Sequence, residues 1–138
     1  QEALGYTFKT PKLLQEALTH PSGATNNQPE FERLEFLGDA VLGLVVVELL
    51  YRKYPQFQEG EMTQIKSAVV SRTSCAEFTQ TLGITQYLRL GRGLNAARLP
   101  ENMLADVFES IVGAIYLDGG MPAVTPFIER FLGPAIEG

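Results

Sequence analysis

The sequence of 138 residues contains little of the chemistry on which several classes of protein depend. It has one cysteine, Cys75, which excludes an internal disulfide framework and favours a reducing compartment. The longest apolar run, AVLGLVVVELL from Ala40, is interrupted by Glu48 and is too short to cross a bilayer. We therefore expect a cytoplasmic protein with no membrane association.

Positive charge is also scarce. Eleven Lys and Arg residues stand against 16 Asp and Glu residues, which gives a net charge of -5. Because phosphate binding normally shows as a basic patch, this balance by itself argues against a nucleic-acid partner. A metal-binding group of acids would account for several of the negative charges, and bound cations would invert the local field. The net charge therefore does not decide whether the protein binds nucleic acid.

Turn-forming residues divide the chain into helices, and no segment shows the alternation of a strand. Thr10 and Pro11 predict the start of a short helix that ends before Pro21. Ser74 and Glu77 have the spacing of a capping box. Further helices are predicted at about 31–55, 61–71, 75–83, 100–120 and 122–132. With 45% hydrophobic and 20% charged residues, the composition is that of an ordinary globular domain. We expect residues 1–138 to form one all-α domain.

Three acids lie on one side of the predicted helix FERLEFLGDAVLGLVVVELL. Glu32, Glu35 and Asp39 stand at positions i, i+3 and i+7, which places them within a narrow arc. No Lys or Arg stands three or four residues from Asp39. The like charges of Glu35 and Asp39 at i, i+4 cost a helix roughly 0.2 to 0.5 kcal/mol. A positive charge from elsewhere is therefore expected beside them.

A second acidic pair lies in PENMLADVFESIVGAIYLDGG, where Asp106 and Glu109 stand at i, i+3 in an otherwise apolar helix. In each helix a glycine follows the last acid by four residues: Gly43 in the first and Gly113 in the second. Since a missing side chain lets two helices approach closely, we expect the two acidic faces to meet. The resulting cluster would consist of Glu35, Asp39, Asp106 and Glu109.

Four carboxylates with no base among them indicate a divalent metal site. Oxygen ligands alone suit hard ions such as Mg²⁺ or Mn²⁺, and no organic cofactor is indicated. One acidic pair is more often a solvated helix face, but two uncompensated pairs with the same glycine offset favour the metal site. His20, the only histidine, ends a short helix before Pro21, where a structural hydrogen bond is commoner than a role as general base.

The segment ERLEFLGDAVL, residues 32–42, resembles the signature of the ribonuclease III endonuclease domain almost letter for letter. Further family-like blocks appear in order: LGYTF from Leu4, LTHPS from Leu18, EGEMT from Glu59, LRLGRG from Leu88 and LADVFESIVGAIYLDGG from Leu104. The resemblance covers almost the whole chain. It implies an all-helical homodimeric endonuclease that depends on Mg²⁺, for which Mn²⁺ substitutes, and that cuts double-stranded RNA.

The resemblance also assigns residues. The metal-binding and catalytic acids of the family fall on Glu35, Asp39, Asp106 and Glu109. Two further family acids with supporting roles at the cleavage site match Glu32 and Glu59. Because the family pairs its subunits around the signature helix, we expect Phe36 at a dimer interface. The candidate phosphate contacts are Lys66, Arg72, Arg89, Arg92 and Arg98.

The mechanism that we expect is two-metal hydrolysis, in which the products bear a 5′ phosphate and a 3′ hydroxyl, in the processing of RNA such as rRNA and mRNA. Bacterial family members usually carry a separate domain for binding double-stranded RNA, and the sequence stops at Gly138 without it. It also opens without Met in QEALGYTF, so we expect a piece of a longer protein.

Three other classes were weighed against this hypothesis. A catalytically inactive relative that serves as an RNA-binding or scaffold domain is the main alternative, and loss of one of the four acids would mark it. A di-iron carboxylate oxidase needs Glu-x-x-His pairs, which a single histidine excludes. A helical protein-interaction domain would have no need of uncompensated acids.

Overall fold

The computed structural model describes residues 4–23, 30–91, 94–95 and 98–137. Its helices are α1 (Pro11–Ala17), α2 (Glu32–Lys53), α3 (Glu59–Val69), α4 (Arg72–Leu82), α5 (Glu101–Gly119) and α6 (Met121–Glu137), with 3₁₀ turns η1 (Pro21–Gly23) and η2 (Thr85–Tyr87). Within these ranges the only β pairing is an isolated bridge between Thr19 and Arg89. The expected all-α fold is confirmed.

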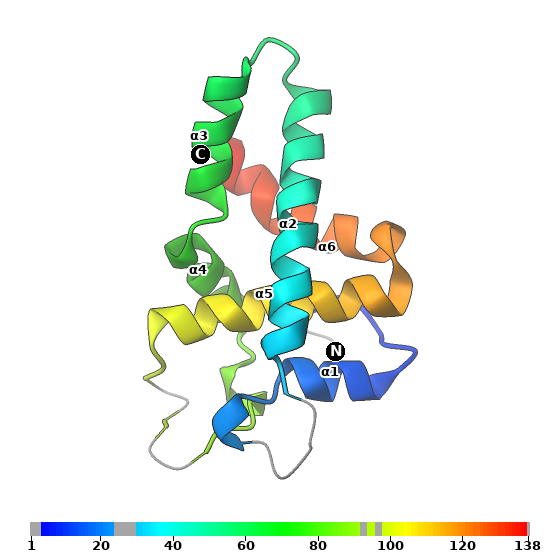
Figure 1. The fold of residues 1–138 in the computed structure, drawn as a ribbon, viewed down its shortest axis with the longest axis vertical. Coiled ribbons are helices and arrows are strands. Elements are labelled where there is room, and N and C mark those ends of the chain that lie inside the picture. The colour runs from blue at the N-terminus through cyan, green and yellow to red at the C-terminus, as the bar shows by residue number, and fades with distance from the viewer. Residues whose placement is uncertain (1–3, 24–29, 92–93, 96–97, 138) are drawn as a thin grey trace.

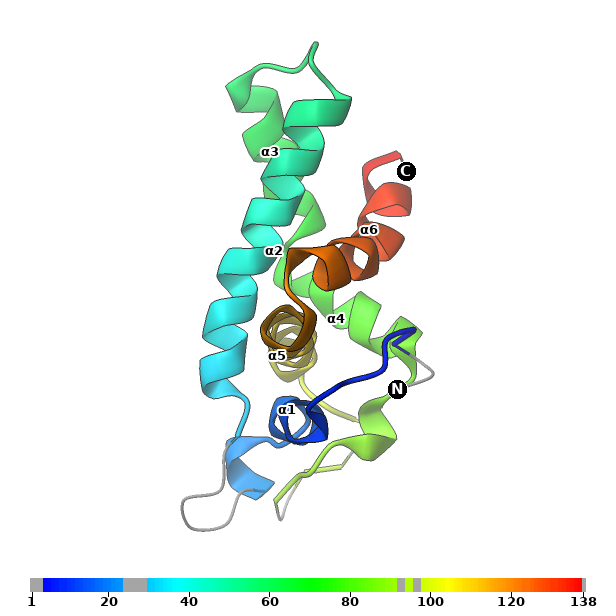
Figure 2. The same cartoon turned by 90° about the vertical axis from the view of Figure 1, so that its right-hand side faces the viewer.

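Helix α5 is the centre of the molecule, since α1, α2, α4 and α6 all pack against it. In Figure 1, α2 crosses over α5 and continues beyond it to the upper end, where α3 returns alongside. Figure 2, turned by 90°, shows α2 on one side of α5, with α4 and α6 on the other. The 22 residues of α2 span about 33 Å, so only part of the helix lies over α5.

The central position of α5 explains its sequence, because a helix that is covered all round has to be apolar on every face. Its residues from Met103 to Ile115 are buried except for Asp106. Phe108 lies at the middle of the core, with its ring centroid 5.1 Å from that of Phe78 and 5.4 Å from that of Phe131. Two acidic side chains on such a helix need a specific reason.

Several helix ends differ from the sequence prediction. The predicted capping box at Ser74 is wrong. Helix α4 begins at Arg72, three residues before the predicted start at Cys75, and its N-cap is Ser71, which accepts a hydrogen bond from the Ser74 amide at 3.1 Å. Gly83 closes this helix with a φ of 65°, as predicted. Helix α6 does not end near Leu132 but continues to Glu137.

No helix in the described part of the chain combines the length and the apolarity that a membrane span requires.

The close approach of α2 and α5 depends on two glycines, of which the sequence identified one. A Cβ atom at Gly113 would overlap the carbonyl oxygen of Leu34, as expected for a glycine at a helix crossing. The matching position on α2 is Gly38, where a Cβ atom would overlap the carbonyl oxygen of Glu109. The prediction for Gly43 is wrong, because a Cβ atom there would meet only the end of the Lys66 side chain, at 3.7 Å.

Candidate metal centre

Four carboxyl groups face one another where α2 crosses α5. Glu35 lies within hydrogen-bonding reach of Asp106, and Asp39 lies within reach of Glu109, so each pair joins the two helices. One carboxylate oxygen from each of Glu35, Asp106 and Glu109 lies within 4.8 Å of the other two. The structure thus brings Glu35, Asp106 and Glu109 together and places Asp39 beside Glu109. We call these four residues the acid cluster.

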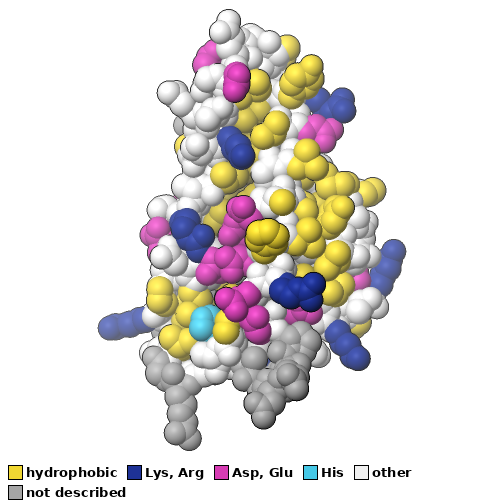
Figure 3. Space-filling model, in the orientation of Figure 1, with side chains coloured by type: hydrophobic (Ala, Val, Ile, Leu, Met, Phe, Trp, Pro, Cys, Tyr) yellow, Lys and Arg dark blue, Asp and Glu magenta, His cyan; other side chains and the backbone are white. Residues whose placement is uncertain are grey.

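The acid cluster opens onto one face of the molecule. In Figure 3 a group of acidic side chains gathers in the middle of this face, with hydrophobic side chains beside it. Burial differs among the members: Glu109 is only 7% exposed, Glu35 and Asp106 are half-buried and Asp39 is exposed. The innermost carboxylate is therefore out of reach of most solvent, whereas the outer edge of the cluster is open to a ligand.

Burial and mutual repulsion raise the pKa of two members of the cluster. The pKa of Glu109 rises to about 8, first because the carboxyl group is buried and then through its contact with Asp39 and the charge of Glu35. The pKa of Glu35 rises to about 7, again first through burial and then through Asp106. Both shifts mean that burial and repulsion between the carboxylates outweigh the positive charge that lies near the cluster. A divalent cation would add further positive charge.

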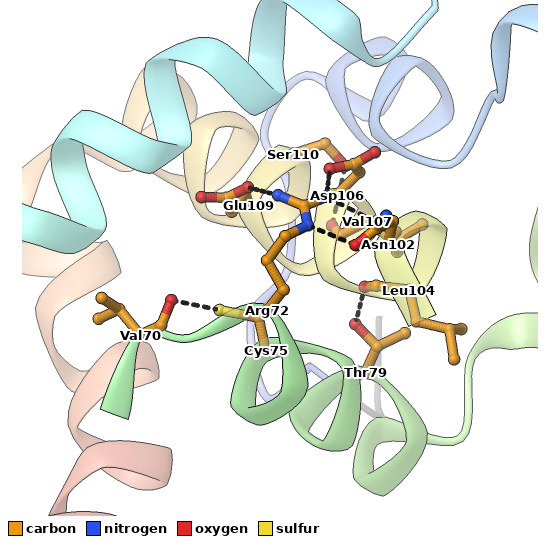
Figure 4. Close-up of polar contacts among 10 residues, drawn as sticks. All are labelled: Val70, Arg72, Cys75, Thr79, Asn102, Leu104, Asp106, Val107, Glu109 and Ser110. Atoms are coloured by element: carbon orange, nitrogen blue, oxygen red, sulfur yellow. Dashed lines mark hydrogen bonds and ion pairs between the residues drawn. The ribbon is translucent and has the colours of Figure 1, made fainter. Parts of the chain in front are cut away.

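The positive charge that the sequence predicted from elsewhere is Arg72 of α4, whereas the expectation that no basic side chain lies among the four acids is wrong. Its Nη2 atom forms an ion pair with Oδ1 of Asp106, and its Nη1 atom lies 3.9 Å from Oε1 of Glu109. Asn102 holds the same guanidinium group: its side-chain oxygen accepts from Nε at 2.9 Å and its carbonyl oxygen accepts from Nη2 at 2.8 Å. Figure 4 shows Arg72 reaching from α4 to these groups on α5. Arg72 lowers the pKa of both Glu35 and Glu109, although burial outweighs it.

The two supporting acids lie at different distances from the cluster. Glu32 is the exposed first residue of α2, and its charge contributes to the raised pKa of Glu35. Glu59 is the first residue of α3, and it lines a groove with Val47 and Tyr51 near the other end of α2. A single chain therefore does not bring Glu59 to the acid cluster.

The candidate phosphate contacts lie in different parts of the chain. Lys66 lies on α3 with its amino group close to α2 at Gly43, whereas Arg89 and Arg98 are exposed in the connection before α5. Arg72 is bound to the acid cluster. Arg92 lies outside the described residues.

His20 and Cys75 lie in surroundings that fit a structural role. The His20 Nδ1 atom accepts a hydrogen bond from the Ser22 amide at 3.0 Å, and its ring packs edge-on against Phe31 at a centroid distance of 5.5 Å. The structural hydrogen bond that the sequence predicted for His20 is therefore present. Cys75 is buried, and burial is the main reason why the pKa of its thiol rises to about 12, so it is no nucleophile.

Sequence reasoning missed Gly38, Asn102 and the ion pairs of Arg72. Gly38 had a signal, since a glycine inside a helix costs roughly 1 kcal/mol relative to Ala and usually has a packing reason. Nothing in the spacing connects Arg72 with Asn102 or Asp106, which are 30 and 34 residues away. Only the packing of α4 on α5 brings them together.

Comparison with known proteins finds extensive similarity. The family described as Ribonuclease-III-like matches residues 10–136. The chain is 47% identical over 138 residues to Ribonuclease 3 of Rhodopirellula baltica and 49% identical over 140 residues to Ribonuclease 3 of Symbiobacterium thermophilum. Each comparison covers 99% of this chain but only 52% and 59% of the relative, so the chain spans little more than half the length of these proteins.

A solved structure shows the same fold. The nuclease domain of ribonuclease III from Campylobacter jejuni superimposes with a TM-score of 0.90 at 33% sequence identity, covering 99% of this chain and 96% of that one. That structure is described as flexible in a region involved in dimer formation.

Proposed function

The chain belongs to the ribonuclease-III-like family, and on that premise we propose that residues 1–138 are the endonuclease domain of an enzyme that hydrolyses phosphodiester bonds in double-stranded RNA. The observation that supports this most strongly is the acid cluster. Its four carboxylates come from two helices that are far apart in the sequence, and they converge where Gly38 and Gly113 let those helices touch. A stabilising role does not explain this arrangement, since burying like charges together costs stability.

We propose Mg²⁺ as the cofactor of the acid cluster, with Mn²⁺ as a substitute. The donors fit such an ion, because they are carboxylate oxygens alone and three of them already lie within 4.8 Å of one another. The residues that would hold it are Glu35, Asp39, Asp106 and Glu109. When bound, divalent ions supply a nucleophile from water near neutral pH and stabilise charge on the departing 3′ oxygen, and two such ions suit in-line hydrolysis.

The protein's part in the reaction is to fix the direction of its carboxylates. Gly38 and Gly113 let the backbones of α2 and α5 lie in direct contact. The side chains of Asp39 and Glu109 therefore project from a rigid part of the backbone. Burial of Glu109 keeps that carboxyl group in one position and excludes water from the inner side of the cluster. Attack in line with the bond to the 3′ oxygen leaves the phosphate on the 5′ side, so the products are a 5′ phosphate and a 3′ hydroxyl.

The exposed face of α2 supports a homodimer. Its apolar side chains include Phe36 at 84%, Leu44 at 55%, Val47 at 47% and Tyr51 at 73% exposure, an unusual concentration for one helix. Large exposed apolar patches mark interaction surfaces, and in Figure 3 hydrophobic side chains extend beside the acids over much of this face. We propose that two copies pair through α2, and that Phe36 lies in the interface.

Such a dimer gives Glu59 a role that the single chain does not. If two α2 helices pair antiparallel about a two-fold axis, the C-terminal end of α2, near Glu59, lies beside the N-terminal end of α2 in the partner subunit. Glu59 of one subunit would then support the acid cluster of the other, whereas Glu32 supports its own. Each dimer has two clusters, one for each strand of the duplex.

RNA recognition would depend on the shape and phosphates of an A-form duplex, because a domain that reads the backbone needs no base sequence. We propose three described cations as phosphate contacts: Lys66, Arg89 and Arg98. Unlike Arg72, they form no ion pair with the acid cluster. Arg92 remains a candidate from the sequence. Arg72 is available to a phosphate only after it leaves Asp106.

A cleavage assay on long duplex RNA tests the proposal. We expect cuts with Mg²⁺ or Mn²⁺ and none with a chelator, and end analysis should find 5′ phosphates and 3′ hydroxyls. A single-stranded RNA of the same sequence is the control for duplex specificity. Binding of duplex RNA without any cleavage at saturating Mg²⁺ would contradict the proposal and favour the inactive scaffold instead.

A further inference from the structure

Arg72 occupies the acid cluster in the way that a metal ion would, by neutralising two of its carboxylates. We propose that Arg72 is a built-in counter-ion that competes with divalent metal for Asp106 and Glu109, so that the guanidinium group has to withdraw when metal binds. This inference rests on the proposed metal-binding function of the acid cluster.

The first argument is that the guanidinium group and a metal ion need the same carboxylates. Nη2 of Arg72 is paired with Oδ1 of Asp106, and Nη1 lies 3.9 Å from Oε1 of Glu109. Asp106 and Glu109 also supply two of the three oxygens that lie within 4.8 Å of one another. A divalent ion on these oxygens would lie within a few ångströms of the positive guanidinium group, in a half-buried site where repulsion is poorly screened.

The second argument is that Arg72 is held in place and also has a way out. Asn102 fixes the guanidinium group through two hydrogen bonds, to its side-chain oxygen at 2.9 Å and its carbonyl oxygen at 2.8 Å. The Arg72 side chain is nevertheless 46% exposed, because it starts at the first residue of α4 on the surface. Rotation of a flexible side chain would move the charge into solvent without any change in the backbone.

The opposite role is also chemically reasonable, and it predicts an effect of opposite sign. If Arg72 remained in place and oriented Asp106 for the metal, then removing Arg72 would weaken metal binding. If Arg72 competes, then removing it strengthens metal binding and leaves the metal-free cluster without its counter-ion. The sign of the change in metal affinity therefore separates the two roles.

The competition also links metal binding to RNA. A displaced guanidinium group lies at the edge of the acid cluster, where the phosphates of a bound duplex would offer it a new partner. The predicted phosphate contact and the observed ion pair are then two states of the same side chain.

The test is a titration of the whole chain with Mn²⁺ alone, in which free Mn²⁺ is followed by electron paramagnetic resonance. We expect Arg72→Gln to bind Mn²⁺ about tenfold more tightly than the wild type, the change expected from one contact between a half-exposed charge and a cation. Its metal-free melting temperature should be lower than that of the wild type, and saturating Mn²⁺ should close the gap.

Two further variants separate competition from a general effect of charge. Arg52→Gln makes the same change in net charge but removes only a surface ion pair with Glu48, so we expect no change in Mn²⁺ affinity. Asn102→Ala keeps the Arg72 charge and removes one anchor of the guanidinium group, so it should tighten Mn²⁺ binding by a smaller factor. Circular dichroism checks that each variant is folded.

Unchanged or weaker Mn²⁺ binding by both Arg72→Gln and Asn102→Ala would overturn the inference while leaving the metal site intact. Absence of Mn²⁺ binding in the wild type and in Arg72→Gln would overturn the proposed function together with it. Binding in Arg72→Gln alone would support the strongest form of the competition.

Discussion

Gly38 of α2 packs directly against the carbonyl oxygen of Glu109 in α5, and this contact joins the fold to the proposed chemistry. A Cβ atom on Gly38 would lie only 1.7 Å from that oxygen. Asp39, the next residue along α2, is the partner of the Glu109 side chain. The close approach of the two backbones and the close approach of the two carboxyl groups therefore have the same cause.

Gly38→Ala should destabilise the protein, because the added methyl group meets backbone and no flexible side chain can yield. We expect a loss of about 3 kcal/mol in the free energy of unfolding, the upper part of the usual range for overpacking. Denaturant unfolding with a chelator present measures it.

Gly43→Ala is the matched control on the same helix. Its Cβ atom would meet only Lys66 side-chain atoms at 3.7 Å, an ordinary contact. Since Ala is the better helix former by roughly 1 kcal/mol, the variant should be neutral or slightly stabilised. Equal losses in the two variants would contradict our account of the helix crossing.

The stability of the metal-free protein should fall as the pH rises. The folded protein holds protons on Glu35 and Glu109 with pKa values of about 7 and about 8, compared with the ordinary value of 4.5. A raised pKa of an acid in the folded state contributes stability that is present below pH 4.5 and is lost as the pH rises through 7 and 8. Because the cluster is open to solvent on its outer side, screening makes the loss smaller than the two shifts taken separately would give, and we expect it to be on the order of 3 kcal/mol.

Thermal unfolding in chelator between pH 5 and about 9 measures this effect, and Glu109→Gln should remove most of the dependence. Mg²⁺ should stabilise the wild type more at high pH than at low pH, because the ion binds the ionised carboxylates. A melting temperature of the metal-free wild type that climbs across this range would show that the cluster is compensated in some other way.

Phe36→Ala should weaken the proposed dimer and leave the folded monomer unaffected. The side chain is 84% exposed in the single chain, so its removal creates no cavity there. As an aromatic anchor of an interface it would contribute about 3 kcal/mol, which corresponds to roughly 100-fold weaker association. Sedimentation over a dilution series measures the change.

Tyr87→Ala is the control for the loss of an exposed aromatic side chain. Tyr87 is 61% exposed in η2, away from the apolar face of α2, and its removal should not alter the mass. A Phe36→Ala variant that remains fully dimeric at the lowest concentration would exclude this residue from the interface.

Duplex RNA should bind weakly to this chain when metal is absent, because the net charge is -5 and few cations are clustered. Ca²⁺ should strengthen binding without producing cuts, since it neutralises the cluster and is a poor substitute for Mg²⁺ in catalysis.

An added domain for binding double-stranded RNA should lower the RNA concentration required but barely change the single-turnover rate at saturation. Filter binding at several salt concentrations tests these points; tight binding independent of metal would reveal a basic surface absent from our account.

Much of this architecture could be predicted from the sequence because its signals are local. Proline and glycine mark most of the helix ends, and the uncompensated acids at helical spacing identified the residues that the structure brings together. The choice of Gly43 in place of Gly38 shows the limit. Both glycines lie in the same helix, and only the crossing point with α5 decides which one makes the contact.

Arg72 shows the same limit for electrostatics. The sequence predicted that a positive charge would approach the acids from elsewhere, but it did not identify its source. That source depends on how α4 packs on α5 and on a start of α4 at Arg72, three residues before the predicted one at Cys75. Charges supplied by another helix are invisible to the spacing rules that apply within one helix.

Single-turnover cleavage of duplex RNA by Asp39→Asn and Glu109→Gln tests the central claim most directly. Each substitution keeps the shape of the side chain and removes one carboxylate charge, so we expect folded protein with a rate lowered at least ~100-fold at saturating Mg²⁺. Glu129→Gln, which removes an exposed acid from α6, should cleave at the wild-type rate. A rate close to that of the wild type in either Asp39→Asn or Glu109→Gln would contradict the assignment of the acid cluster as the catalytic metal site.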